Sequence, residues 1–290
     1  MSAWVLGLIG GSGLYDIPGL EGAWETIETP WGAPSDQIFR ARLHGVDLLF
    51  LPRHGRGHRL SPTAINYRAN IDALKRAGAT DVLSLSACGS LREDLAPGTF
   101  VLVDQYVDRT HARAKSFFGE GLVAHVSMAA PTCPRLSMFA AAAARQAGAA
   151  VAESGTYLAM EGPQFSTLAE SKLYRVWGMD VIGMTGMPEA KLAREAELPY
   201  ASVAMVTDYD CWRVETEAVS VANVLETLHA NAGKAKTLIA HLAADLARTP
   251  RTPSPIDTCL DAALITAPEA RDPTLVAKLD AVAGRVLRKT

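Results

Sequence analysis

Two aspartates, Asp208 and Asp210, directly follow an apolar run at residues 200–206 and are the most chemically suggestive feature of this sequence. Positions i and i+2 of a strand point to the same side, so a strand ending here brings both carboxylates together. Because burial penalises a charged carboxylate, such a pair must meet either a partner in the fold or a ligand. Taken alone, the pair is equally consistent with a solvated turn, where Asp is a common residue.

Residues whose donors could bind an anion follow several other apolar runs of the sequence. Arg offers a planar fork of donors, and a neighbouring His adds a donor whose charge follows pH. Glycine-rich turns expose backbone N–H groups, and a threonine just before a predicted helix start is well placed for an anion. An ordinary turn or a solvated basic loop explains each cluster alone, but together they predict one phosphate or phosphoryl site. The candidate residues are Ser12, Arg53, His54, Ser86, Ala87 and Thr185.

The elements that must position these groups alternate along the chain. Apolar runs typical of buried strands cover residues 5–9, 38–43, 46–52, 82–86, 100–107, 155–160, 180–184 and 200–206. Helical patterns cover residues 64–77, 134–147, 169–177, 188–197, 217–247 and 273–287. This alternation predicts an α/β fold with a mixed, largely parallel central sheet flanked by helices in three layers. Ligands bind at the carboxyl ends of strands in such sheets, so we expect the candidate residues to share one site.

Composition narrows the class of protein. At 290 residues and 49% hydrophobic, the chain suits a single domain over 1–290, in which 250–290 forms a Pro-rich linker and a final helix. A net charge of −3 gives no broad basic field for nucleic acid or an anionic membrane. The four cysteines lack metal-site or disulfide spacing, and no leader or membrane-spanning pattern is evident, so we expect no metal and a cytoplasmic protein.

Several strings carry a family resemblance. They are IGGSGL at 9–14, RHG at 53–55, NYRAN at 66–70, ACGSLRE at 87–93, EGPQFS at 161–166, MT at 184–185, PE at 188–189 and AMVTDYDCW at 204–212. Through them the chain resembles the S-methyl-5′-thioadenosine phosphorylase family, of the trimeric purine nucleoside phosphorylase superfamily. The strings occur in family order from residue 5 to about 240, and the resemblance is weak after Pro250.

The resemblance implies a reaction and a purine nucleoside phosphorylase fold. The family cleaves methylthioadenosine with inorganic phosphate to adenine and 5-methylthioribose-1-phosphate, in methionine and purine salvage. Phosphate is a co-substrate, and the family uses neither metal nor other cofactor. The implied partners are therefore small molecules and identical subunits, in a homotrimer or a dimer of trimers.

The resemblance also implies a role for each matching residue. The six anion candidates named above would bind phosphate, and Met184 would contact the ribose hydroxyls. Phe165 would pack on the purine, while Asp208 and Asp210 would face its N7 and 6-amino side. An apolar 5′ pocket would receive the methylthio group, and a residue of the neighbouring subunit would close it. These last residues are Val221, Val224 and Leu225 for the pocket and His125 for the neighbour.

Physical reasoning supports an adenine site independently of the resemblance. Adenine presents an acceptor at N7 and a donor at its 6-amino group, and a protonated carboxyl matches both. As the glycosidic bond breaks, N7 gains negative charge, so a proton delivered there by Asp208, with Asp210 in support, assists the leaving group.

Two rival functions remain open from the sequence. A 6-oxopurine phosphorylase, acting on inosine or methylthioinosine, would meet acceptors at both O6 and N7, which favours Asn over Asp. A non-catalytic nucleotide-binding protein could use the same fold, although the full set of phosphate candidates disfavours it. The product of a phosphate-dependent assay separates all three: adenine, hypoxanthine or nothing.

Replacing Asp208 by Asn tests the acid pair. Asp208→Asn should lower adenine release about 10²–10⁴-fold, the usual effect of losing a positioned acid, and shift preference toward 6-oxopurine nucleosides. Initial rates on methylthioadenosine and methylthioinosine give the substrate ratio. A ratio equal to that of the unmodified protein would contradict the assignment.

Overall fold

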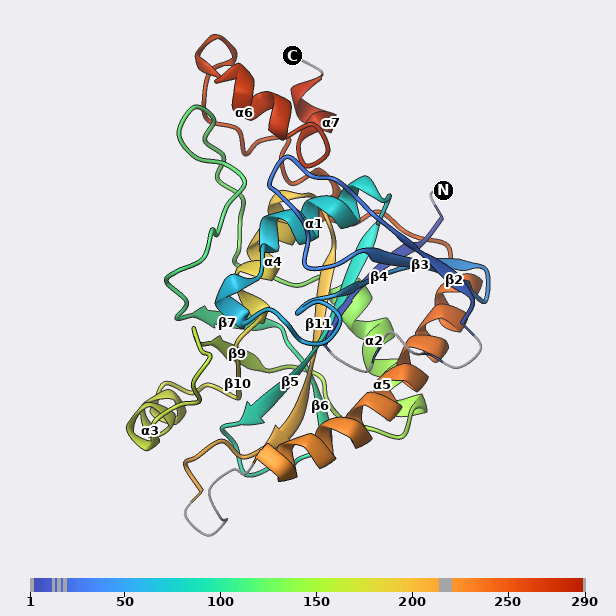
Figure 1. Cartoon of the computed structure of the whole chain (residues 1–290), viewed down its shortest axis with the longest axis vertical. Coiled ribbons are helices and arrows are strands. Elements are labelled where there is room, and N and C mark those ends of the chain that lie inside the picture. Colours follow the sequence, from blue (N-terminus) through green and yellow to red (C-terminus); the bar gives the residue numbers. More distant parts are fainter. Residues whose placement is uncertain (1–2, 12–13, 15–16, 18–19, 214–220, 289–290) are drawn as a thin grey trace.

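The computed structural model describes residues 3–288 except 12–13, 15–16, 18–19 and 214–220, and it gives only the backbone of 221–225. One mixed sheet runs through the molecule with helices on both faces (Figure 1), which confirms the predicted α/β class. Its strands are β1 (Val5–Gly10), β2 (Gly22–Glu25), β3 (Ile38–Leu43), β4 (Val46–Pro52), β5 (Asp81–Ser90), β6 (Thr99–Leu102), β7 (Gln105–Asp108), β8 (Ala150–Ala152), β9 (Thr156–Ala159), β10 (Val181–Gly183) and β11 (Tyr200–Asp208).

Helices cover the sheet as two separate layers. Helices α1 and α4 pack together over one core cluster, and α2 and α5 pack together over another. The α-helices are α1 (Tyr67–Arg76), α2 (Pro134–Gln146), α3 (Leu168–Val176), α4 (Gly186–Glu195), α5 (Val221–Arg248), α6 (Pro273–Lys278) and α7 (Gly284–Leu287). Short 3-10 helices occur at η1 (Pro62–Ala64), η2 (Pro255–Thr258) and η3 (Pro268–Ala270).

Strand β5 is the branch point of the sheet. It pairs in parallel with β1 as far as Ser84 and with β11 along most of its length. Its last two residues, Gly89 and Ser90, pair antiparallel with β10. Between the β1 and β10 pairings, the stretch around Ser86 and Ala87 has no strand neighbour on that edge among the described residues. Backbone groups of β5 are therefore open to a ligand at this gap.

Local chemistry explains the helix and turn positions that the sequence predicted. The side chain of Asn66 accepts a hydrogen bond from Ala69 N (3.1 Å) and caps α1, and Gly78 ends it with a φ of +96°. His44 and Gly45, with φ of +51° and +89°, form the tight turn between β3 and β4. These elements confirm the strands predicted at 38–43 and 46–52, which pair as a hairpin, and the helix predicted at 64–77.

Three local predictions were wrong. The single strand expected at 100–107 is two strands, because β6 pairs with β11 and β8 whereas β7 pairs with β9 in the other branch. The strand expected at 82–86 does not end at Ser86, since β5 continues to Ser90. The final helix expected at 273–287 is the pair α6 and α7, with the buried residues Leu279 and Ala283 in the turn between them.

The segment after Pro250 packs against the rest of the chain through ion pairs and apolar contacts. Arg251 is buried and donates to Asp81 (2.6 Å), to Asp257 and to the carbonyl of Thr80. Arg285 pairs with the buried Glu197 (2.5 Å). Several C-terminal apolar residues, including Leu260 and Leu279, belong to the core cluster beneath α1 and α4.

Candidate active site

A cavity of about 580 Å³ lies where the ends of β4, β5, β10 and β11 meet. Strands that are distant in sequence deliver their terminal residues to this one place, as expected for a sheet of this kind. Most of the candidate residues that the structure describes line it. They are Arg53, His54, Ser86, Ala87, Phe165, Met184, Thr185, Asp208 and Asp210.

The remaining candidates lie elsewhere or outside the description. Ser12 and the side chains of Val221, Val224 and Leu225 fall outside the described residues. His125 is not among the residues that line the cavity, and its N–H donates to the carbonyl of Ala263 in the C-terminal segment (2.9 Å).

Helix α5 contributes two cavity residues that sequence reasoning missed. Leu228 and Ala232 line the cavity, and they continue the i, i+3, i+4 spacing of the predicted apolar face by one and two further turns. Extending that periodicity past residue 225 would have found them. Met160, Ile182 and Met205 also line the cavity, without any motif that marks them as ligand contacts.

The two aspartates lie in different local environments. Asp208 Oδ1 accepts from Asp210 N (2.8 Å), and Asp208 Oδ2 accepts from Thr207 Oγ1 (2.7 Å). Asp210 Oδ2 and the nearby Ser171 Oγ are both buried without a well-formed hydrogen bond in the described part of the chain. Asp210 Oδ2 therefore has acceptor capacity that the described residues do not fully use.

Burial raises the pKa of both carboxyls. For Asp208, hydrogen bonds from Thr207 and from the backbone of Asp210 oppose this effect. For Asp210, the contact with Ser171 opposes it, and the charge of Asp208 adds to it. Because two adjacent carboxyls titrate as a unit, this environment favours a proton held by the pair.

Close backbone approach makes room for the pair. Asp210 has a left-handed φ of +52°, and the pairing of β11 with β5 shifts register between Val206 and Asp208. A Cβ added at Gly89 would lie 3.1 Å from Asp208 Oδ1 and 3.3 Å from Asp210 Cβ. Glycine at position 89 therefore lets both aspartates lie over β5.

Arg53 is fully buried, and its fork points at a carboxylate of the protein. Its Nε and Nη2 donate to the two carboxylate oxygens of Glu189, at 2.9 and 3.1 Å. Nη2 also donates to Ile9 O and Ser84 Oγ, and Nη1 donates to Leu85 O. The guanidinium has five N–H groups, so one Nη1 hydrogen remains for the cavity. The fork that we expected to bind phosphate is instead used for Glu189.

His54 is largely buried in the turn that follows β4. Its Nδ1 lies 2.8 Å from the carbonyl of Leu60, so Nδ1 carries the hydrogen and Nε2 is the other ring nitrogen available for a ligand. The ring stacks on His58 with centroids 4.2 Å apart. Burial lowers the pKa of His54 to about 4 against the opposing effect of the Leu60 hydrogen bond, and the charge of Arg53 lowers it further.

Ser86, Ala87 and Thr185 supply neutral donors. Ser86 Oγ is buried beside Tyr157 without a well-formed hydrogen bond, and Ala87 is exposed to the cavity at the gap in β5. Thr185 precedes α4, whose Met187 has an extended backbone, and its side chain makes no capping hydrogen bond to the helix. Both hydroxyls are therefore available to a ligand.

Gly183, before the Met184–Thr185 pair, lies against Tyr157. A Cβ added at Gly183 would lie 1.9 Å from Tyr157 Oη, closer than any side chain tolerates. Glycine is thus required at position 183 for as long as a tyrosine occupies position 157.

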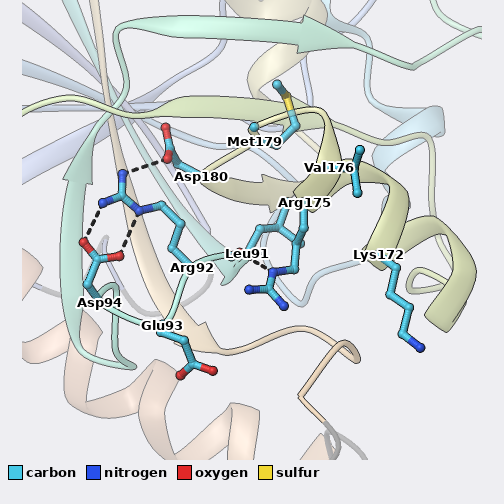
Figure 2. A pocket seen from close by; sticks show the side chains of 10 residues that line it. Leu91, Arg92, Glu93, Asp94, Lys172, Arg175, Val176, Met179 and Asp180 are labelled. Atoms are coloured by element: carbon cyan, nitrogen blue, oxygen red, sulfur yellow. Dashed lines mark hydrogen bonds and ion pairs between the residues drawn. The ribbon is translucent and has the colours of Figure 1, made fainter.

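A second hollow, between the end of β5 and α3, lacks the candidate residues (Figure 2). Its Arg92 donates to Asp94 (2.5 Å) and to Asp180 (2.9 Å), so its charge is already balanced. Figure 2 shows Lys172 extending away from these carboxylates. We therefore place the active site at the strand-end cavity, where buried polar groups lack partners.

Two further observations apply to the described residues alone. The described residues contain no group of three or more His, Cys, Asp or Glu side chains arranged to hold a metal ion. Within the same residues, none of the helices has the length and apolar character needed to cross a membrane.

The fold and the cavity define an enzyme of the phosphorylase superfamily, whose family model matches residues 5–244. The S-methyl-5′-thioadenosine phosphorylase of Bradyrhizobium diazoefficiens is 64% identical over 99% of this chain and all of its own. That of Cereibacter sphaeroides is 63% identical over 98% of this chain and 99% of its own. The chain belongs to the family of S-methyl-5′-thioadenosine phosphorylases.

Solved structures give the same result. A methylthioadenosine phosphorylase from an Antarctic soil metagenomic library superposes with a TM-score of 0.89 at 45% identity, covering 97% of this chain and 99% of its own. The Schistosoma mansoni methylthioadenosine phosphorylase, solved in complex with adenine, gives a TM-score of 0.81 at 37% identity, over 85% of this chain and 93% of its own.

The lowered pKa of His54 predicts how stability depends on pH. The unfolded chain takes up a proton at this residue as pH falls below about 6.5, whereas folded His54 stays neutral until about pH 4. The difference at His54 therefore lowers the free energy of unfolding as pH falls through this window, by up to about 1.4 kcal/mol per pH unit. An amide does not titrate in this range, so His54→Asn should reduce this slope, and Asn keeps a donor near the position of Nδ1.

Denaturant unfolding at pH 5 to 7 measures the slope. His229→Asn is the matched control, because His229 is an exposed residue of α5 that does not line the cavity. The control should leave the slope unchanged. Equal slopes in His54→Asn and the unmodified protein would show that His54 is not the titrating group.

Proposed function

We propose that this enzyme cleaves S-methyl-5′-thioadenosine with inorganic phosphate, giving adenine and 5-methylthioribose-1-phosphate. The observation that carries the proposal is one cavity that combines a buried acid pair, Asp208 and Asp210, with a set of anion donors. A phosphate oxygen attacks C1′ of the ribose, the bond from C1′ to N9 breaks, and its electron pair stays with the purine. Phosphate is the co-substrate, and the reaction needs no further cofactor.

At the base end, the acid pair supports the departure of adenine. The pair carries a proton that it shares, and it donates this proton to N7 as negative charge develops on the purine. A carboxyl oxygen accepts from the 6-amino group at the same time. Asp210 Oδ2, which lacks a well-formed hydrogen bond, supports a direct contact from that residue. Phe165, exposed at the rim of the cavity, packs against the purine.

At the phosphate end, neutral donors do most of the binding. Ser86 Oγ, Thr185 Oγ, the backbone at Ala87 and one N–H of Arg53 surround the anion, with His54 Nε2 nearby. Ser12 is assigned to the same role from the sequence. Because these donors are held by the fold, they need no reorganisation when charge develops on the ribose. Met184 contacts the ribose hydroxyls between the two ends.

An apolar wall from α5 favours the methylthio group. Leu228 and Ala232 line the cavity, and Val221, Val224 and Leu225 continue the same helical face by sequence. A 5′-hydroxyl placed against such a wall lacks a partner and costs about 1–3 kcal/mol. The wall therefore selects methylthioadenosine over adenosine.

The active unit is a homotrimer, or a dimer of trimers, in which His125 of one subunit closes the 5′ pocket of the next. Two observations support this assembly. His125 lies outside the cavity of its own chain, and α3 beside that cavity exposes apolar side chains at Leu168, Leu173 and Val176.

Two further features complete the proposal. A cytoplasmic location fits the four cysteines, all of which lie in the described part of the chain as free thiols.

The whole chain, 1–290, functions as one domain, because the segment after Pro250 shares a core cluster with α1 and α4.

A substrate panel tests the reaction. With phosphate present, methylthioadenosine should exceed adenosine about ten- to a hundredfold in kcat/KM, as expected if the 5′ cost is realised in the transition state. The panel is methylthioadenosine, adenosine, methylthioinosine and inosine, with the released base identified. Release of hypoxanthine faster than adenine would make the enzyme a 6-oxopurine phosphorylase, and no release would refute phosphorolysis.

Sedimentation and a histidine variant test the shared pocket. The active species should sediment as a trimer or hexamer, and His125→Ala should lower kcat/KM for methylthioadenosine more than for adenosine. Phosphate KM should stay within about twofold, because the role assigned to His125 is a contact with the 5′ group and not with phosphate. A fully active monomer would contradict the shared pocket.

A further inference from the structure

Arg113 is a buried arginine that the mechanism above does not use. It lies in the segment after β7, its side chain is 1% exposed, and it does not line the cavity. A buried arginine without ligand contacts must direct its donors to the protein itself.

Its donors converge on the backbone of two cavity walls. Nη1 donates to the carbonyls of Met184 (2.5 Å) and Met187 (2.8 Å), and also to Tyr67 Oη. Nη2 donates to the carbonyls of Glu161 (2.6 Å) and Met160. The first wall follows β10 and supplies Met184 and Thr185, and the second follows β9 and supplies Met160. Arg113 thus joins two segments that a ligand would touch at once.

The carboxylate of Glu161 balances the charge of Arg113 and connects it to a third wall of the cavity. Its Oε1 accepts from Arg113 Nε (3.1 Å) and from Thr63 Oγ1, and its Oε2 accepts from His111 N (2.6 Å). Burial opposes ionisation of Glu161, but these hydrogen bonds prevail and lower its pKa to about 2. Thr63 lies in η1, next to Ser61 and Pro62 of the cavity lining.

We propose that Arg113, paired with Glu161, is the positioning residue that fixes the geometry of the phosphate and ribose end of the active site. This inference rests on the proposed function. Because a peptide bond is planar, holding the Met184 carbonyl fixes the plane that leads into Thr185. The direction of the Thr185 hydroxyl and the position of Met184 therefore depend on Arg113. A shift of about 1 Å at reacting groups costs up to about a hundredfold in rate.

Arg251 provides a matched control for a purely structural role. It is also a buried arginine, with the partners Asp81, Asp257 and the carbonyl of Thr80. None of these partners lines the cavity. Losing either arginine removes an ion pair of a buried guanidinium, so both variants should lose stability, but only one should alter the site. Asp81 keeps Arg135 as a second ion-pair partner.

The experiment compares Arg113→Ala with Arg251→Ala, assayed at temperatures equally far below their melting points. Arg113→Ala should lower kcat about 10- to 100-fold and raise the KM for phosphate at least fivefold. Arg251→Ala should leave both constants within twofold. Millimolar guanidinium should restore part of the kcat of Arg113→Ala, because it can occupy the vacated site. Equal kinetic effects in the two variants, or no rescue, would overturn the proposal.

A measurement of phosphate binding tests the role of Arg113 separately from the proposed reaction. If the unmodified enzyme does not cleave methylthioadenosine, the proposed function fails, and calorimetric titration with inorganic phosphate still tests Arg113. Its alanine variant should then bind phosphate at least fivefold more weakly, and Arg251→Ala within twofold. If Arg113→Ala does not fold, Glu161→Gln takes its place. Glu161→Gln should weaken phosphate binding at least threefold, and unchanged affinity would overturn the proposal.

Discussion

The buried ion pair between Arg53 and Glu189 joins most of the elements that build the site. Arg53 follows β4 and reaches the carbonyl of Ile9 in β1 and the hydroxyl of Ser84 in β5. Glu189 lies in α4 and also accepts from Tyr200 Oη of β11 (2.8 Å). Removing one partner of a fully buried pair leaves an uncompensated charge, at a cost of about 3–5 kcal/mol. The alignment of these strand ends with the start of α4 therefore depends on this contact.

The pairing also determines which groups the cavity offers to the proposed anion. Glu189 balances Arg53 and Glu161 balances Arg113, so both of these buried arginines have a carboxylate partner. In the proposed function, a phosphate group is then bound chiefly by oriented hydroxyl and N–H dipoles. Such binding is firm only when the geometry is correct, because a dipole loses strength with distance and angle faster than a net charge does. A site of this kind depends on the rigidity of its walls.

The sequence predicted which residues meet at one cavity better than it predicted the elements around that cavity. Motifs at strand ends located Arg53, His54, Thr185 and the two aspartates, because the carboxyl ends of strands in such a sheet share one edge. The division of 100–107 into β6 and β7 depends on pairing with distant strands, which no local pattern encodes. Likewise, the direction of the Arg53 fork depends on a partner 136 residues away in the chain.

The contact between Gly183 and Tyr157 constrains how this site can change through evolution. Since a Cβ at position 183 would overlap Tyr157 Oη, any larger residue there is excluded until position 157 loses its phenol ring. The reverse change, from tyrosine to a shorter side chain, would first open a void beside the cavity residues Met184 and Thr185. We therefore expect residues 157 and 183 to change together among homologous enzymes. Each homologue should carry either glycine at 183 with tyrosine at 157, or a larger residue at 183 with a shorter side chain at 157.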